Sequence, residues 1–176
     1  MLTAYRFTES PVSEENARQQ ERPLKTLVIG LGNPIMTDDG AGLEVVRRLR
    51  KKLPAPDVEF IEASVGGIGL LDQIAGYDRL ILIDTIRNAG GIPGQIYRLS
   101  PNDLGPTNHL CSPHDIGFKQ AIKLGEKVGL EIPREIVIYA IEAQDALTFA
   151  EGCTRVVAEA VEELVRRIIA EWFDHS

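Results

Sequence analysis

The stretch at residues 25–42, KTLVIGLGNPIMTDDGAG, decides the fold that we predict for this chain. It opens with a short, continuous apolar run at 25–31 that is bounded by glycine, which is typical of a strand buried in a parallel sheet. A loop with two adjacent acids, Asp38 and Asp39, follows the strand. Helical spacing of apolar residues then begins at residue 42 and stops at Pro54, so the stretch predicts a strand, a loop and a helix.

The alternation of strands and helices continues through the rest of the chain. The pattern predicts further strands at 58–64, 79–86, 94–99 and 135–142, and helices at 68–74, 114–128 and 154–172. The most hydrophobic strand, at 79–86, is expected at the centre of the sheet, and the strand at 94–99 at an edge. This order indicates an α/β fold, a three-layer sandwich whose mainly parallel, twisted sheet of about five strands carries helices on both faces.

Length and composition indicate one domain. The chain has 176 residues, of which 44% are hydrophobic and 26% charged, and this is ordinary globular composition. We place the domain at residues 24–173. Residues 1–23 are polar and lack the apolar core of a signal peptide. We expect them to form a flexible extension.

Charge, hydropathy and cysteine content narrow the possible partners. A net charge of -7 argues against nucleic acid as a ligand, because phosphate binding needs a concentrated basic face. No apolar run approaches the roughly 18–20 residues that span a bilayer, so we expect no membrane insertion. The two cysteines, Cys111 and Cys153, form no CxxC pair, which fits a reducing cytoplasm.

Three residues far apart in the chain form a candidate metal site. Asp39 lies in the first loop, Asp84 lies near the end of the strand at 79–86, and His114 begins the helix predicted at 114–128. An α/β sheet gathers functional side chains at junctions of this kind. Two carboxylates and an imidazole can hold a divalent cation and leave coordination positions open for chemistry.

Each member of this trio also has a purely structural interpretation. Asp39 could cap the helix that begins near Gly40, although Asp38 is the better candidate for that cap. His114 could be bonded to a nearby carbonyl oxygen. Asp84 is harder to explain in this way, because a buried carboxylate needs a partner or a metal.

Other chemistries have weaker support. The glycine loop lacks the third glycine of a dinucleotide fingerprint, since Ile35 stands there, and it has no GK[ST] for a phosphate loop. Cys111 with His114 could be a thiol nucleophile or half of a zinc site. No second ligand pair completes the zinc site, and nothing in the sequence orients the imidazole toward sulfur.

Three ordered motifs resemble the [NiFe]-hydrogenase maturation endopeptidases. These are the opening G-x-G-N-x-x-x-x-D-[DE]-G-x-G, a hydrophobic strand with Asp84, and Ser112-Pro113-His114 before a later helix. The glycine pair Gly66-Gly67 after the second strand is similar as well, and the resemblance covers roughly residues 25–170. The opening V-x-G-L-G-N-P also resembles peptidyl-tRNA hydrolase, but no histidine occurs near the position of that family's catalytic residue.

The first resemblance implies an endopeptidase that removes a C-terminal extension from a [NiFe]-hydrogenase large-subunit precursor after nickel insertion. It assigns the metal ligands to Asp39, Asp84 and His114, and it adds Asp38 as the family's first acid. The nickel is expected to arrive with the substrate, although other divalent metals can occupy such a site. Either the metal activates the cut, as in metallopeptidases, or the trio only recognises it. A chaperone that checks the metal without cutting is the alternative function.

Three further residues are expected to contact the substrate. Gly66 and Gly67 could expose backbone for pairing with an extended peptide, although a simple loop is equally compatible with them. Asn33 is expected beside the substrate and, together with Gly32, to shape the turn after the first strand, with glycine supplying a positive φ and asparagine a local hydrogen bond.

Overall fold

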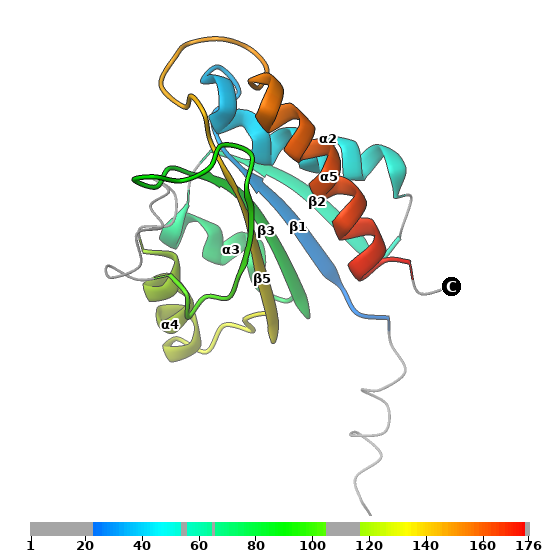
Figure 1. Cartoon of the computed structure of the whole chain (residues 1–176). Coiled ribbons are helices and arrows are strands. Elements are labelled where there is room, and N and C mark those ends of the chain that lie inside the picture. The colour runs from blue at the N-terminus through cyan, green and yellow to red at the C-terminus, as the bar shows by residue number, and fades with distance from the viewer. Residues whose placement is uncertain (1–22, 54–55, 65, 105–116, 175–176) are drawn as a thin grey trace, which may run out of the picture.

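A five-stranded sheet forms the middle layer of the protein (Figure 1). A computed structural model describes residues 23–53, 56–64, 66–104 and 117–174. The strand order is β2-β1-β3-β5-β4, and only β4 runs antiparallel to its neighbour. The strands are β1 (Thr26–Leu31), β2 (Val58–Ala63), β3 (Arg79–Ile86), β4 (Ile96–Leu99) and β5 (Glu135–Glu142). The predicted central position of β3 and the edge position of β4 are confirmed.

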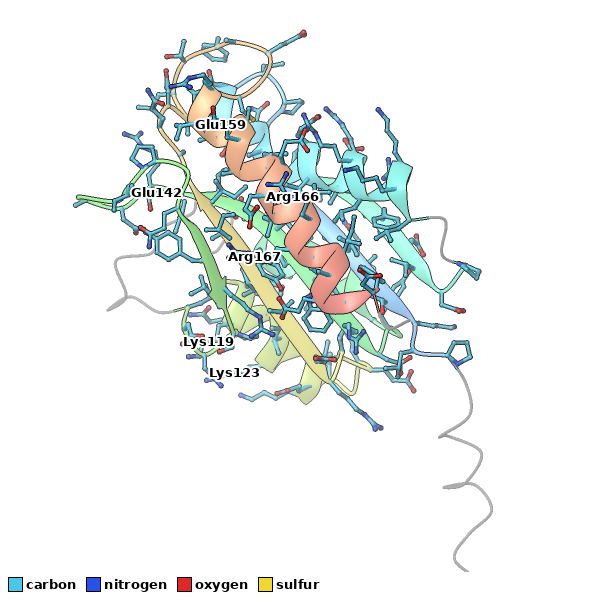
Figure 2. The ribbon with its side chains drawn as sticks, turned by 45° about the vertical axis from the view of Figure 1, so that its right-hand side comes forward. Lys119, Lys123, Glu142, Glu159, Arg166 and Arg167 are labelled. Atoms are coloured by element: carbon cyan, nitrogen blue, oxygen red, sulfur yellow. The ribbon has the colours of Figure 1, made fainter. Side chains whose placement is uncertain are left out.

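Helices cover both faces of the sheet, as the three-layer prediction requires (Figure 1). Helices α2 (Ala41–Lys52) and α5 (Arg155–Trp172) pack on one face, and α3 (Leu71–Ile74) and α4 (Phe118–Lys127) pack on the other. Two short 3₁₀ helices, η1 (Thr37–Gly40) and η2 (Gly67–Leu70), lead into α2 and α3. The outward side of α5 carries charged residues such as Glu159, Arg166 and Arg167 (Figure 2).

Side-chain alternation along the buried strands explains why both faces are apolar. In β3, Ile81 and Ile83 point toward α2 and α5, whereas Leu80 and Leu82 point toward α3 and α4. Neighbouring strands repeat this division, so the sheet has a separate core on each side. A continuous apolar run is therefore the correct signature of a central strand here.

Helix α2 crosses β1 and β3 at very short range because two glycines meet there. A Cβ added to Gly42 would lie 2.4 Å from the carbonyl oxygen of Leu31 and 2.6 Å from that of Ile83. A Cβ added to Gly30 would lie 2.3 Å from the carbonyl oxygen of Gly42. The absence of side chains at both positions brings the start of α2, and the loop before it, close to the sheet.

The helix predicted at 114–128 begins later than expected. Gly117 has φ +98°, a left-handed conformation that a continuous helix cannot contain, and α4 starts at Phe118. The spacing of apolar residues along the sequence cannot reveal a left-handed residue that interrupts a helix. The predicted start at His114 lies outside the described residues.

The predicted N-terminal extension and the expected absence of membrane insertion are the two remaining predictions about the fold. Residues 1–22 of the predicted extension lie outside the described residues. Within the described part of the chain, none of the helices combines the length and the apolar character needed to cross a membrane.

Candidate active site

The two candidate acids lie at the carboxyl end of the sheet, beside the point where the strand order reverses. After β1 the chain moves to β2 on one side, and it then returns to β3 on the other side of β1. Loops that leave the carboxyl ends of strands at such a switch point diverge and leave room for a ligand. Asp39 follows β1, and Asp84 belongs to β3.

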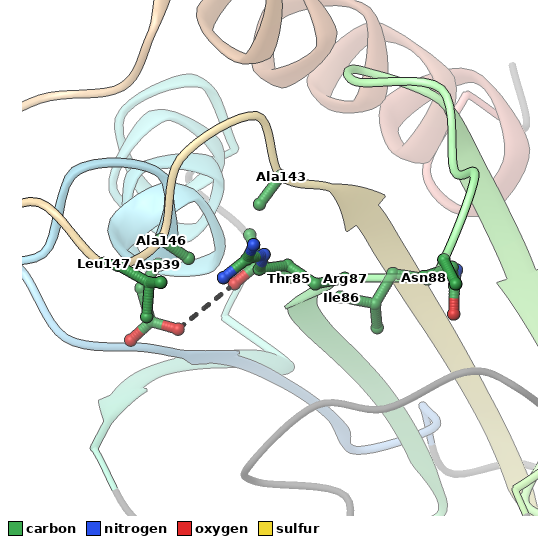
Figure 3. A pocket seen from close by; sticks show the side chains of 9 residues that line it. Asp39, Thr85, Ile86, Arg87, Asn88, Ala143, Ala146 and Leu147 are labelled. Atoms are coloured by element: carbon green, nitrogen blue, oxygen red, sulfur yellow. Dashed lines mark hydrogen bonds between the residues drawn. The ribbon is translucent and has the colours of Figure 1, made fainter.

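The carboxylate of Asp39 is held in place by groups from both strands. The backbone N–H of Asn33 donates to Asp39 Oδ2 at 2.8 Å. The hydroxyl of Thr85, the residue after Asp84, donates to Asp39 Oδ1 at 3.4 Å (Figure 3). These contacts bring the first loop and the end of β3 together, as predicted. They also account for Asp39 without a helix cap, since no side-chain hydrogen bond caps α2.

Asp84 is fully buried, with an exposed fraction of 0%. Its Oδ1 accepts a hydrogen bond from the backbone N–H of Thr85 at 2.8 Å. By strand alternation its side chain points to the face that α3 and α4 cover. Helix α4, which follows residue 114 in the chain, packs on this same face.

His114 lies outside the described residues, so its role remains a prediction. Its nearest described neighbour in sequence is Gly117, and a Cβ added there would lie 4.0 Å from the Cα of Gly67. The start of α4 therefore lies beside η2, the segment after β2. Among the residues that the structure describes, no three metal-binding side chains form a cluster, and metal binding by Asp39 and Asp84 stays a prediction.

Asp38 does not cap the helix near Gly40, and that prediction was wrong. Its side chain is 0% exposed and accepts four hydrogen bonds from the connection between β5 and α5. The donors are the backbone N–H groups of Gln144 (2.9 Å), Asp145 (2.8 Å) and Thr154 (2.7 Å) and the hydroxyl of Thr154 (3.0 Å). A buried carboxylate requires such partners, and these donors come from a loop more than a hundred residues away. The contacts give Asp38 a positioning role, and its catalytic role stays a prediction.

The turn after β1 has the predicted chemistry. Gly32 has φ +146°, and the side-chain oxygen of Asn33 accepts a hydrogen bond from the N–H of Ile35 at 3.3 Å. A Cβ at Gly32 would lie 1.9 Å from the carbonyl oxygen of Asp39, so the turn folds directly onto the acid loop. After β2, Gly67 has φ +62°. Contact of Asn33, Gly66 and Gly67 with the substrate stays a prediction.

A cavity of about 480 Å³ opens beside Asp39 (Figure 3). Five apolar residues and four polar residues line it: Ile86, Ala89, Ala143, Ala146 and Leu147, with Asp39, Thr85, Arg87 and Asn88. Most of these residues follow β3 or β5, and no motif in the sequence distinguishes them. Their position after the ends of two buried strands is the signal that could have found them.

Glu142, at the end of β5, is a buried carboxylate that organises one wall of this region (Figure 2). It accepts hydrogen bonds from the backbone N–H of Asn88 at 2.6 Å and from the side-chain amide of Asn88 at 2.7 Å. A Cβ at Gly91 would lie 2.2 Å from its carboxyl carbon. Glu142 thus fixes the turn after β3 and does not itself line the cavity.

Cys153 packs against the core that α2 and α5 share. Burial, followed by the charges of Asp38 and Glu44, raises the pKa of its thiol to about 11. A thiol with this pKa is protonated at neutral pH, so Cys153 is a poor nucleophile. Cys111, the other candidate thiol, lies outside the described residues.

Comparison with known proteins identifies the family. The family model for the hydrogenase maturation protease HycI matches residues 43–171. This chain belongs to the hydrogenase maturation protease family. It is therefore a peptide hydrolase, and the matched region begins just after the Asp38–Asp39 loop.

Individual members of the hydrogenase maturation protease family agree with this assignment. The hydrogenase 2 maturation protease of Escherichia coli K12 is 27% identical over 150 residues, which cover 84% of this chain and 90% of that protein. The hydrogenase expression/formation protein HupD of Bradyrhizobium diazoefficiens is 26% identical over 155 residues, covering 84% and 79%.

Solved structures of the family share the fold. The hydrogenase maturating endopeptidase HybD from E. coli superposes with a TM-score of 0.70 at 25% identity, covering 84% of this chain and 91% of that one. HybD from Thermococcus kodakarensis, a [NiFe] hydrogenase maturation protease, gives 0.63 at 26% identity, covering 84% and 97%. Because the chain belongs to the hydrogenase maturation protease family, the peptidyl-tRNA hydrolase alternative is rejected.

Proposed function

We propose that this protein removes a C-terminal extension from the large-subunit precursor of a [NiFe] hydrogenase, and that it recognises nickel already bound by that precursor. Membership of the hydrogenase maturation protease family supports the reaction class. The single observation that supports the site is the position of Asp39. Its carboxylate accepts a hydrogen bond from Thr85 at the end of β3, and it lines a mainly apolar cavity. In this proposal the trio of Asp39, Asp84 and His114 contacts the nickel, which is part of the substrate.

The cavity suits a short stretch of extended peptide. Its apolar wall can receive a side chain of the substrate, and its polar groups are few and lie at defined positions, as in most ligand sites. Asn88 also lines the cavity, and its side-chain amide donates a hydrogen bond to Glu142 Oε2 at 2.7 Å.

The donor set explains why the nickel should arrive with the substrate. Carboxylates and one imidazole bind metal less firmly than thiolate-rich sites do, so this protein alone is a weak host. A precursor that holds nickel can supply the remaining ligands, and tight docking then requires both halves. Such coupling allows an irreversible cut to depend on metal insertion.

Hydrogen bonds within this protein orient the two candidate acids before the precursor binds. The Asn33 N–H and the Thr85 hydroxyl orient the carboxylate of Asp39, and the Thr85 N–H orients that of Asp84. Held in this way, the two acids lose little freedom when a metal docks, which favours binding. We place this reaction in the cytoplasm, in keeping with a chain of only two cysteines.

The test compares nickel-loaded and nickel-free forms of one purified precursor, each incubated with chelator-treated protein. The mass of the large subunit reports the cut. Only the nickel-loaded form should lose its extension. Equal cleavage of both forms would overturn recognition of nickel, and cleavage that returns only when zinc is restored to the protein would indicate a resident catalytic metal.

A further inference from the structure

Large apolar side chains are exposed mainly around the carboxyl end of the sheet. Of the eight such residues in the described part of the chain, five follow a strand at that end: Ile35, Ile68, Ile92, Leu147 and Phe149. Exposed apolar residues scattered singly need no explanation, but a group beside a functional site does. The other three lie elsewhere: Leu24 lies before β1, Leu124 lies within α4, and Val128 follows α4 directly.

Three of the five come from two loops that are paired through their backbones. The N–H of Thr37 donates to the carbonyl of Ala150 at 2.9 Å, and the N–H of Ala150 donates to that of Ile35 at 3.2 Å. The Thr37 hydroxyl adds a bond of 2.6 Å to the carbonyl of Thr148. The two loops lie side by side at one end of the molecule (Figure 1). We call Ile35, Leu147 and Phe149 the paired-loop surface.

The paired loops are fixed, although their apolar side chains face water. Asp38 holds the second loop at both of its ends, through Gln144 and Asp145 and through Thr154. The carboxylate of Asp145 accepts the N–H groups of Leu147 and Thr148, each at 3.0 Å. The hydrogen bond with the Thr148 side chain is the largest cause that lowers the pKa of the Asp145 carboxyl below its ordinary value, and the hydrogen bond from the Leu147 N–H is the next largest. A loop ordered to this degree presents its apolar residues in one arrangement, which lowers the entropic cost of binding a partner.

The paired-loop surface is continuous with the active-site cavity. Leu147 belongs to both, since it lines the cavity together with Asp39. Phe149 is 75% exposed two residues after Leu147, and Ile35 is 51% exposed in the loop that is paired with it. In the proposed function, the chain end that reaches Asp39 belongs to the precursor, and the paired-loop surface begins at the cavity that this chain end enters.

We propose that the paired-loop surface docks an apolar patch on the folded body of the large-subunit precursor, next to the chain end that is cut. This inference rests on the proposed function and adds a second contact outside the cavity. The occupant is the precursor, because the surface begins at the cavity that its chain end enters. The surface contributes to holding the precursor, and the groups that act at the cut lie elsewhere.

The test substitutes two exposed side chains that do not line the cavity, in Ile35→Ser/Phe149→Ser, and uses Phe149→Ser as a milder variant. Leu124→Ser/Val128→Ser is the matched control, because these residues are 42% and 64% exposed on and just after α4. Initial cleavage rates are measured over a range of nickel-loaded precursor concentrations. The double variant should raise KM about tenfold or more and change kcat less than about twofold, because only ground-state docking is lost. The control should match the unsubstituted protein.

Three other results would contradict docking of the precursor on the paired-loop surface. An unchanged KM in a folded double variant that still cuts would overturn docking and leave the proposed function intact. A change of oligomeric state in solution with an unchanged KM would replace the precursor by a second copy of this chain. If the unsubstituted protein neither binds nor cuts the precursor, both proposals fail together.

Discussion

The carboxyl group of Asp84 lies at a position with no exposure to water. Apolar strand residues surround it along the chain, and a buried charge is costly unless it is paired or bound to a metal. Asp39 differs, because it is only partly buried and lines an open cavity. The two acids therefore combine one fixed, shielded carboxylate with one that a substrate can reach.

Removing either carboxylate, or the imidazole of His114, should abolish processing while the protein stays folded. Asp39→Asn and Asp84→Asn keep the side-chain volume and remove the charge, and His114→Ala removes the third predicted ligand. Because loss of groups that merely support ligands already costs about 10–100-fold, we expect a decrease of about a hundredfold or more in kcat/KM. The measurement is cleavage of nickel-loaded precursor, with far-UV circular dichroism as a check of folding.

Asp57→Asn is the control for these substitutions, since Asp57 is exposed at the opposite end of β2. It should retain full activity. Normal cleavage by any one folded site variant would remove that residue from the site.

The raised pKa of the Cys153 thiol predicts a specific pH dependence. The folded value of about 11 lies above the ordinary value of 9.0, so the thiol stays protonated over the pH range of most assays. In a Cys111→Ser variant, the rate of reaction with a thiol reagent should rise about tenfold per pH unit between pH 8 and 10, because only the thiolate reacts. A rate that levels off between pH 9 and 10, as expected for a thiol with the ordinary pKa of 9.0, would contradict the shift. Cys153→Ser should retain protease activity.

At the scale of elements, the crossing of α2 over the sheet sets how the first loop meets β3. A helix with glycine at its second position would gain stability from alanine if helix propensity alone mattered, by about 1 kcal/mol. Here the methyl group would collide with two backbone oxygens that cannot move aside easily. Packing between elements should therefore outweigh propensity.

Gly42→Ala should lower the free energy of unfolding by about 1–3 kcal/mol or more, as overpacked sites do. Urea denaturation followed by circular dichroism measures the change. Gly40→Ala provides the comparison, because its φ of -77° suits any residue and a Cβ there would meet its nearest atoms at 3.5 and 3.6 Å. Its unfolding free energy should change by less than about 0.5 kcal/mol. Similar effects of both substitutions would refute the close crossing.

At the scale of the whole molecule, the sequence predicted the layers, the central strand and the edge strand, because these depend on apolar periodicity. The positions of Asp39 and Asp84 at one end of the sheet followed from the same pattern. Asp38 was misassigned, since its partners lie in a loop that no local pattern connects to it. The late start of α4 and the cavity wall from Thr85 to Ala89 were missed for a similar reason: they depend on a backbone reversal and on contacts between distant loops.

The bonds of Asp38 also constrain when the site can form during synthesis. Its donors lie 106, 107 and 116 residues further along the chain. Strands β1, β2 and β3 can be made and paired long before these donors leave the ribosome, and contacts between distant segments form late. Until these donors have been made, the carboxylate of Asp38 lacks the hydrogen bonds that it accepts in the folded protein. We therefore expect a chain that is cut short before residue 144 to lack an ordered acid loop, and the growing polypeptide to acquire the capacity to cut only after these donors have been made.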